Sequence, residues 1–207
     1  MRQGHPFRDF EQGGRSEAFA LEGMVATSHP MATLAALEVL REGGNAVDAA
    51  VTAAAMQAVV EPTQSGLGGD TFALVMPDRA GKPIALDGSG WAPKAASLDA
   101  FAERQISRIE IESAHAVTVP GAVAAWERLL RDHGTRDLAR VLAPAIKAAE
   151  QGCPIPERLA RDWSLQTAKL ARSEAAARTF LFDGKPPMAG TIHRQPQLAQ
   201  ALRSIAK

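Results

Sequence analysis

The chain has 207 residues, and its 23 basic side chains balance its 23 acidic ones, which makes the formal net charge zero at pH 7. A chain of this length can bury one large core or two modest ones, and one domain is the default expectation. Proteins that bind nucleic acids or membranes typically carry an excess of basic residues, which this chain does not have. Neither nucleic acid nor a membrane is therefore an expected partner. The single cysteine, Cys153, excludes an internal disulfide and a cysteine-based zinc cluster within this chain.

The N-terminal residues predict a flexible leader over residues 1–22, because they are polar and rich in glycine. They lack the apolar core that a signal peptide requires. No stretch of the sequence is long and apolar enough to predict a membrane span. A cytoplasmic location is the simplest expectation.

In chain order, residues 23–29 predict a short strand and residues 30–44 a helix, with Pro30 tolerated in the first turn. Ser28 is interpreted as the residue that caps this helix. Asn45 and Asp48 follow, at the spacing of a helix start in which a carboxylate reaches back to the first amides. The alanine-rich segment after Asn45 therefore predicts a second, buried helix.

The pattern then changes to strands and back to helices. Two short apolar runs, TFALVM (71–76) and KPIALDG (82–88), are separated by a turn signal and predict an antiparallel hairpin. Further helical segments are predicted over residues 120–134, 137–152 with a break or kink near Pro144, about 157–178, and 195–207. The chain is therefore expected to be mainly helical with a few strands.

The stretch EPTQSGLGGDTFALV (61–75) raises the possibility of a phosphate-binding glycine loop. Such a loop follows a strand and opens a helix, whose first amides face the anion. Here a helix precedes the glycines, a strand follows them, and no lysine comes after them. We therefore interpret Gly66, Gly68 and Gly69 as a tight turn where backbones pack closely.

The residues by themselves reveal no convincing catalytic constellation. Ser65 lacks the preceding glycine of a nucleophile elbow. The five histidines show no metal-ligand pair at helical spacing, and each is expected to be structural or exposed. Neither a metal nor a cofactor is expected.

Several long blocks of the sequence are nevertheless distinctive, among them GGNAVDAAVTAAAMQAVVEPTQSGLGGDTF, LDGSGWAPKAAS and HAVTVPGAVAAWERLLRDHG. Together they resemble the gamma-glutamyltransferase family, and the likeness runs from Gly23 to the last residue in the same order. The resemblance implies an α+β fold, the αββα sandwich of the N-terminal nucleophile hydrolases. It also implies a proenzyme that cuts itself to free a threonine at the start of a small subunit. That threonine attacks the gamma-glutamyl amide while its own amine serves as the base.

The resemblance further implies which part of such an enzyme this chain is. The family's processing threonine lies downstream of the blocks matched here, so residues 23–207 are expected to be the front part of the large subunit. Thr27 is not the nucleophile, because the family motif leads into a strand and Thr27 leads into a helix. We expect a small subunit from the same precursor as partner, a gamma-glutamyl or related amide as substrate, and no activity from the chain alone.

One departure from the family pattern concerns substrate binding. Well-characterised members carry an arginine just after LDG, which grips the α-carboxylate of the substrate. That place is Ser89 here, and two residues on lies Trp91. Ser89 and Trp91 are the candidate substrate-binding residues, for another amide as in the cephalosporin acylases and oxamate amidohydrolases. Two alternatives are that Trp91 merely packs under the loop and that Lys94 supplies the missing anion contact.

A non-catalytic scaffold is the competing interpretation of the whole chain. It is favoured by the absence of the nucleophile and of the arginine. The enzyme interpretation expects hydrolysis to be preferred over transfer, with donors beyond glutathione.

Overall fold

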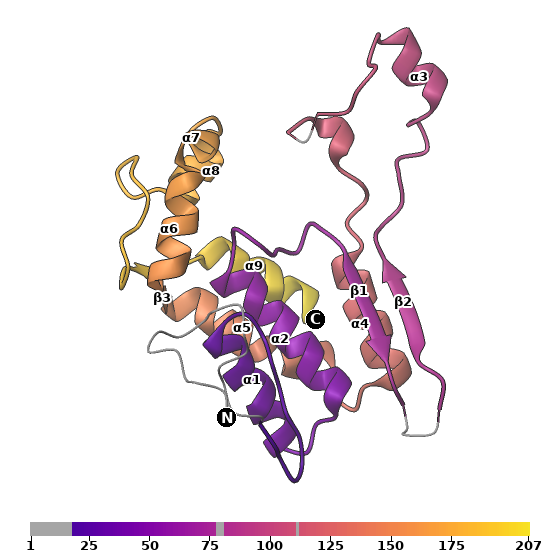
Figure 1. Ribbon diagram of the computed structural model, residues 1–207, viewed down its shortest axis with the longest axis vertical. Helices are drawn as coiled ribbons and strands as arrows, with labels where there is room; N and C mark the ends of the chain where they lie inside the picture. Colours follow the sequence, from indigo (N-terminus) through magenta and orange to yellow (C-terminus); the bar gives the residue numbers. More distant parts are fainter. Residues whose placement is uncertain (1–17, 78–80, 111) are drawn as a thin grey trace, which may run out of the picture.

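The computed structural model describes residues 18–77, 81–110 and 112–207 (Figure 1). The predicted leader lies outside the described residues up to residue 17, and residues 18–22 form neither helix nor strand. The elements are α1 (Pro30–Arg41), α2 (Ala46–Val60), β1 (Thr71–Val75), β2 (Ile84–Gly88), α3 (Leu98–Glu103), η1 (Ala114–Ala116), α4 (Ala122–His133), α5 (Leu138–Gln151), β3 (Cys153–Pro154), α6 (Glu157–Leu165), α7 (Thr167–Leu170), α8 (Glu174–Phe180), β4 (Ile192–His193) and α9 (Pro196–Ile205).

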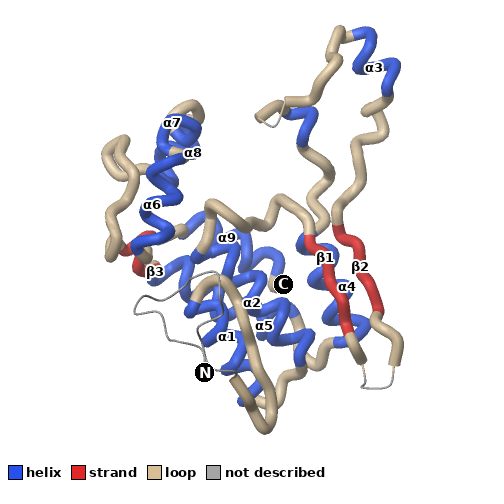
Figure 2. The backbone as a smooth tube through the Cα atoms, viewed as in Figure 1, coloured by secondary structure: helices blue, strands red, loops and turns tan. Residues whose placement is uncertain are grey.

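The helix α2 lies at the centre of a helical body (Figure 2). It packs against α1, α4 and α5, and α5 in turn packs against α9. Small side chains such as Ala53 and Ala55 are buried along α2, which allows its neighbours to approach closely. Val51 and Leu142 are almost wholly enclosed in the same core. The prediction of a buried second helix is confirmed.

The junction between α1 and α2 follows the predicted cap chemistry. The Asn45 carboxamide oxygen accepts from the amides of Val47 and Asp48 at 2.9 and 3.0 Å. In return the Asp48 carboxylate accepts from the Asn45 amide at 2.8 Å. Gly43 ends the preceding helix with φ +82°, a conformation that glycine adopts without a steric penalty. This reciprocal capping box starts α2 at Ala46.

The strand predicted over residues 23–29 is wrong, because that segment pairs with no other strand among the described residues. The Thr27 hydroxyl instead donates to the carbonyl of His29 at 2.8 Å. Ser28 is not the helix cap either: its hydroxyl donates to Glu61 and accepts from Gln57 at 2.8 Å. The residue that caps α1 is His29.

Two further helix predictions need correction. The helix α5 continues across Pro144, so the break predicted there is wrong, and Val141 and Ala145 beside the proline are fully buried. A kink at Pro144, the other form of that prediction, stays a prediction. The segment 157–178 is not one helix but three short ones, α6, α7 and α8. Gln166 ends α6 and begins α7 with φ −97° and ψ 0°, which departs from helical geometry.

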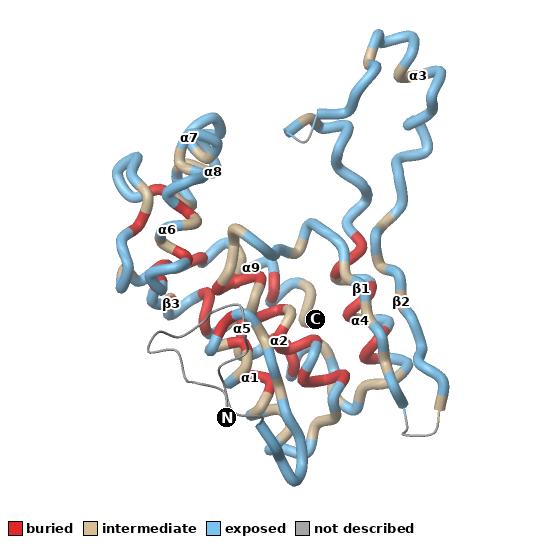
Figure 3. Tube along the Cα trace, in the orientation of Figure 1, coloured by how far each residue is buried: buried red, intermediate tan, exposed pale blue. Residues whose placement is uncertain are grey.

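The strands β1 and β2 form the predicted antiparallel hairpin, with Thr71 opposite Gly88 and Val75 opposite Ile84. The turn predicted between them lies partly outside the described residues. One face of the hairpin packs on α4, as the half-buried residues Ala73, Val75 and Leu86 show. The other face is open (Figure 3): Phe72 is 63% exposed and Leu74 80%. A hairpin with one apolar face uncovered presents a surface for a further layer.

Between β2 and α4 the chain leaves the helical body as a long arm that carries α3 at its far end (Figure 1). The two sides of the arm come together again beside the hairpin, where α4 begins. No helix in the described part of the chain is both long and apolar enough to cross a membrane.

Candidate functional site

Three loops meet where the arm joins the hairpin. The first is the glycine-rich loop before β1, whose last glycine, Gly69, is bound to the start of α4. Its carbonyl oxygen accepts from the amides of Gly121 and Ala122 at 3.0 and 3.1 Å. These two amides belong to the N-terminus of α4, where a helix has no internal partners for them. The glycine-rich loop therefore satisfies the first amides of α4 through its own carbonyl oxygen.

The second and third loops are the segments that follow β2 and precede α4. Within the loop after β2, the Ser89 amide donates to the Asp87 carboxylate at 2.9 Å. Across the two loops, the Val119 amide donates to the Trp91 carbonyl at 2.9 Å and the Thr118 hydroxyl to the Ser89 carbonyl at 3.3 Å. These bonds hold the backbone of Ser89 and Trp91 and leave their side chains free.

The close packing predicted for the glycines occurs here, at a different set of them. Gly90 has φ +78°, and a Cβ on it would lie 1.9 Å from the carbonyl oxygen of Val119. A Cβ on Gly121 would lie 2.2 Å from the carbonyl oxygen of Gly88. No side chain fits at either position.

The turn predicted at Gly66, Gly68 and Gly69 is present at residues 67–68, but the close packing predicted there is wrong. A Cβ on any of them would have nothing within 4 Å among the described residues. The reason is that the contact made by this loop runs through a carbonyl oxygen, which any residue could supply.

Both predicted site residues lie on the loop after β2, at this junction. Trp91 is 85% exposed and Ser89 is exposed as well. Trp91 does not pack under the loop, so that alternative fails. Lys94, three residues on, is also exposed. Thr118 and Val119 were not predicted to belong to the site; the helix start predicted at residue 120 lies next to them, but their bonds to Ser89 and Trp91 depend on the tertiary fold.

Two buried histidines with altered pKa values make contacts within the fold. Burial lowers the pKa of both His29 and His193. His29 caps α1, and His193 lies among the rings of Trp163, Phe180 and Phe182. No group of three or more His, Cys, Asp or Glu side chains suited to a metal ion occurs within residues 18–77, 81–110 and 112–207.

The sequence match to known proteins extends over most of the chain. The profile described as gamma-glutamyltranspeptidase matches residues 32–207. The chain belongs to the gamma-glutamyltranspeptidase family. It is 40% identical over 199 residues to the oxamate amidohydrolase proenzyme of Klebsiella pneumoniae. That alignment covers 92% of this chain and 37% of the relative. It is 37% identical over 188 residues to the glutathione hydrolase proenzyme of Bacillus subtilis, and that alignment covers 89% of this chain and 32% of the relative.

Solved structures of family members share the fold. The cephalosporin acylase from Bacillus halodurans superposes with a TM-score of 0.88 at 37% identity, over 99% of this chain and 38% of that one. The Helicobacter pylori gamma-glutamyltranspeptidase superposes with a TM-score of 0.85 at 32% identity, over 92% and 56%. The predicted fold class, a mostly helical portion of an N-terminal nucleophile hydrolase, is confirmed. The chain spans about a third of the length of the curated relatives named above.

Proposed function

We propose that residues 23–207 form the front part of the large subunit of an enzyme that hydrolyses a small amide, with Ser89 and Trp91 in its donor pocket. The nucleophile in this proposal is the N-terminal threonine of a small subunit made from the same precursor. Family membership supports the reaction class, since the named relatives are an oxamate amidohydrolase, a glutathione hydrolase and a cephalosporin acylase. A nucleophile whose own amine is the base needs no histidine or metal from this chain.

The observation that carries the specificity proposal is a neutral serine on a rigidly held loop. The backbone at Ser89 is bound by Thr118, and the adjacent Gly90 admits no other residue. A serine hydroxyl offers one neutral hydrogen bond, whereas an arginine grips a carboxylate with two charged ones. A donor without the α-amino acid head group of a gamma-glutamyl compound therefore loses less here than in a member with arginine.

The exposed face of the hairpin supports the two-subunit part of the proposal. Phe72 and Leu74 lie on it, and Met76 continues the same alternation at 58% exposed. Alternating apolar side chains at these exposures are typical of a sheet face that another layer covers. In this proposal the small subunit supplies that layer, together with the nucleophile.

The isolated 207-residue chain is accordingly expected to be inactive. The test is release of p-nitroaniline from gamma-glutamyl-p-nitroanilide by the purified chain, compared with the enzyme assembled from both subunits. Turnover by the chain alone would contradict the proposal.

The specificity is tested in the two-subunit enzyme with the variant Ser89→Arg. We expect kcat/KM for gamma-glutamyl donors to rise by about tenfold, the value of one added charge-assisted interaction, while kcat/KM for a neutral amide without a carboxylate does not rise. The matched control is Ser107→Arg, which adds the same charge at an exposed position farther along the arm. Equal effects of the two variants, or a wild-type enzyme strictly selective for gamma-glutamyl donors, would exclude the proposed role of Ser89.

A further inference from the structure

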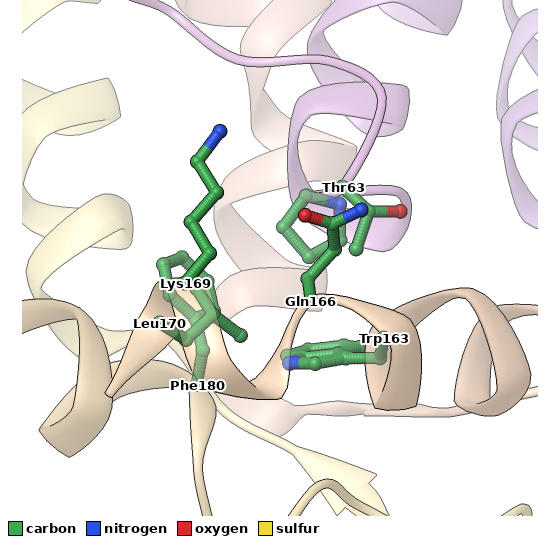
Figure 4. A pocket seen from close by; sticks show the side chains of 7 residues that line it. Thr63, Trp163, Gln166, Lys169, Leu170 and Phe180 are labelled. Carbon is green, nitrogen blue, oxygen red and sulfur yellow. The ribbon is translucent and has the colours of Figure 1, made fainter. Parts of the chain in front are cut away.

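A cavity lies away from the Ser89 loop, between the turn after α2 and the helices α6 to α8 (Figure 4). Its volume is about 190 Å³. The side chains that matter for its chemistry are those of Thr63, Trp163, Gln166, Lys169, Leu170 and Phe180. Neither Ser89 nor Trp91 belongs to it, and the proposed amide hydrolysis does not use it.

The bend between α6 and α7 builds one wall of the cavity. Gln166 ends the first helix, and its carbonyl accepts from the amide of Leu170 at 2.9 Å, which starts the next turn at once. Figure 4 shows Gln166 over the ring of Trp163, which is 1% exposed, with Leu170 to one side and Lys169 extending away from the ring at the rim. The Phe180 ring packs edge-on against Trp163 with centroids 5.8 Å apart. The cavity therefore has apolar walls at a fixed spacing.

Two polar atoms at this cavity are buried without a partner. The indole Nε1 of Trp163 and the hydroxyl of Thr63 make no hydrogen bond within the part of the chain that the structure describes. Figure 4 shows the indole nitrogen at the end of the ring nearest Leu170 and Phe180. Buried donors of this kind are normally satisfied, and an unpaired one is costly. Both atoms have almost no accessible surface, so a ligand in the cavity reaches them only after the side chains around them shift.

The charge of the lining selects the kind of ligand. Lys169 is the one charged side chain among the residues that line the cavity, and no carboxylate accompanies it. The indole N–H donates only, and the lysine ammonium also donates only. An anion that accepts hydrogen bonds suits these donors. An amine would be repelled by Lys169 and would find no carboxylate in the lining to pair with.

We propose that this cavity binds a small organic carboxylate whose apolar body is a single ring or a short branched chain. The carboxylate oxygens face Lys169 and Gln166 at the rim, and the body lies between Leu170, Phe180 and the Trp163 ring. The size agrees, because an apolar cavity of about 150 Å³ holds a benzene ring. The ligand would also touch Thr63, which lies on the segment that leads to the glycine-rich loop.

The test is an NMR titration of the 207-residue chain with sodium benzoate, observed at the indole N–H of Trp163. The chain has three tryptophans, and Trp91 and Trp126 serve as internal references. We expect the Trp163 signal to move in a saturable way and the other two to stay. Benzylamine, the matched cation, is expected to bind about tenfold more weakly, because its charge meets Lys169.

Variants of the exposed Lys169 separate this cavity from other binding. Lys169→Gln is expected to weaken benzoate binding about tenfold, Lys169→Arg to retain it, and the control Lys185→Gln, at an exposed lysine outside the cavity, to leave it unchanged. Because Lys169 and Lys185 are exposed, none of these changes disturbs the core. A Trp163 signal unmoved up to the solubility limit of benzoate, or equal binding of benzoate and benzylamine, would overturn the proposal. This readout is independent of amide hydrolysis, so either proposal can fail while the other stands.

Discussion

Asp48 and Thr135 are 87 positions apart in the chain and make two hydrogen bonds with each other. The Asp48 carboxylate accepts from the Thr135 amide at 2.9 Å and from its hydroxyl at 2.6 Å. It also accepts from the amides of Arg136 and Asn45. The residue is fully buried. One carboxylate therefore joins the start of α2 to the connection between α4 and α5.

Replacing Asp48 is expected to destabilise the fold. Burial opposes ionisation of Asp48, but the hydrogen bonds from Thr135, Asn45 and Arg136 outweigh it and lower its pKa. We expect Asp48→Asn to reduce the free energy of unfolding by about 2–4 kcal/mol, because an amide cannot accept four hydrogen bonds and adds a buried donor. Urea denaturation followed by circular dichroism measures this.

The matched control for that variant is Asp132→Asn, which removes a carboxylate paired with Arg128 on the surface of α4. Ion pairs at such exposed sites contribute little to stability. An equal loss in the free energy of unfolding for the two variants would contradict the proposed role of Asp48 in joining α2 to the connection between α4 and α5.

The cap of α1 predicts a pH dependence near neutrality. The Nδ1 atom of His29 accepts from the Met31 amide at 3.2 Å and must be unprotonated to do so. Burial lowers the pKa of His29 below its ordinary value, with Glu61 opposing the shift. Since the unfolded state then binds the proton more tightly, the stability due to neutral His29 is complete above a pH of about 6.5. It is lost progressively as the pH falls below that value.

The variant His29→Asn tests this directly, because asparagine caps a helix without titrating. Urea unfolding between about pH 5 and 7 should show a smaller loss of stability than in the wild type. Some loss is expected to remain, since burial lowers the pKa of His193 too. The control is His115→Asn at an exposed histidine; a wild-type slope unaltered by His29→Asn would refute the assignment.

The loop that carries Ser89 and Trp91 is expected to depend on Gly90. Gly90→Ala combines a strained positive φ with a clash against the Val119 carbonyl, and we expect it to cost about 3 kcal/mol or more. Gly184→Ala has a similar φ of +76° but meets nothing within 4 Å, and should cost about 1 kcal/mol. The difference between the two variants in the loss of thermal stability measures the effect of the clash with the Val119 carbonyl, because both share the positive φ. Equal losses would show that strain alone matters.

The open face of the hairpin is expected to make the isolated chain associate. Leu74→Lys should shift the protein toward monomer in size-exclusion chromatography with light scattering, because it interrupts the exposed apolar row. Leu34→Lys, at a leucine of α1 that is 55% exposed, provides the comparison and should change the association much less. A chain that is monomeric without either change would contradict the prediction.

Much of the fold could be predicted from short-range patterns. The capping box at Asn45 needs only residues three apart, and the hairpin needs only two apolar runs and a turn. The strand at residues 23–29 could not be judged in this way, because a strand exists only where a partner pairs with it. The same limit explains the Ser28 error: whether its hydroxyl caps α1 or binds Glu61 depends on where α2 ends.

The sequence by itself determined the family and the identity of the residue at position 89, since both depend on which side chains occur in which order. Tertiary structure decided where close packing occurs: at Gly90 and Gly121 rather than at Gly66, Gly68 and Gly69. It also decided that Trp91 is exposed. The physical reason is that a glycine is required where a distant backbone segment approaches its Cα. The sequence shows where the glycines occur, but only the packing of β2 against the start of α4 brings another backbone segment close to Gly90 and Gly121.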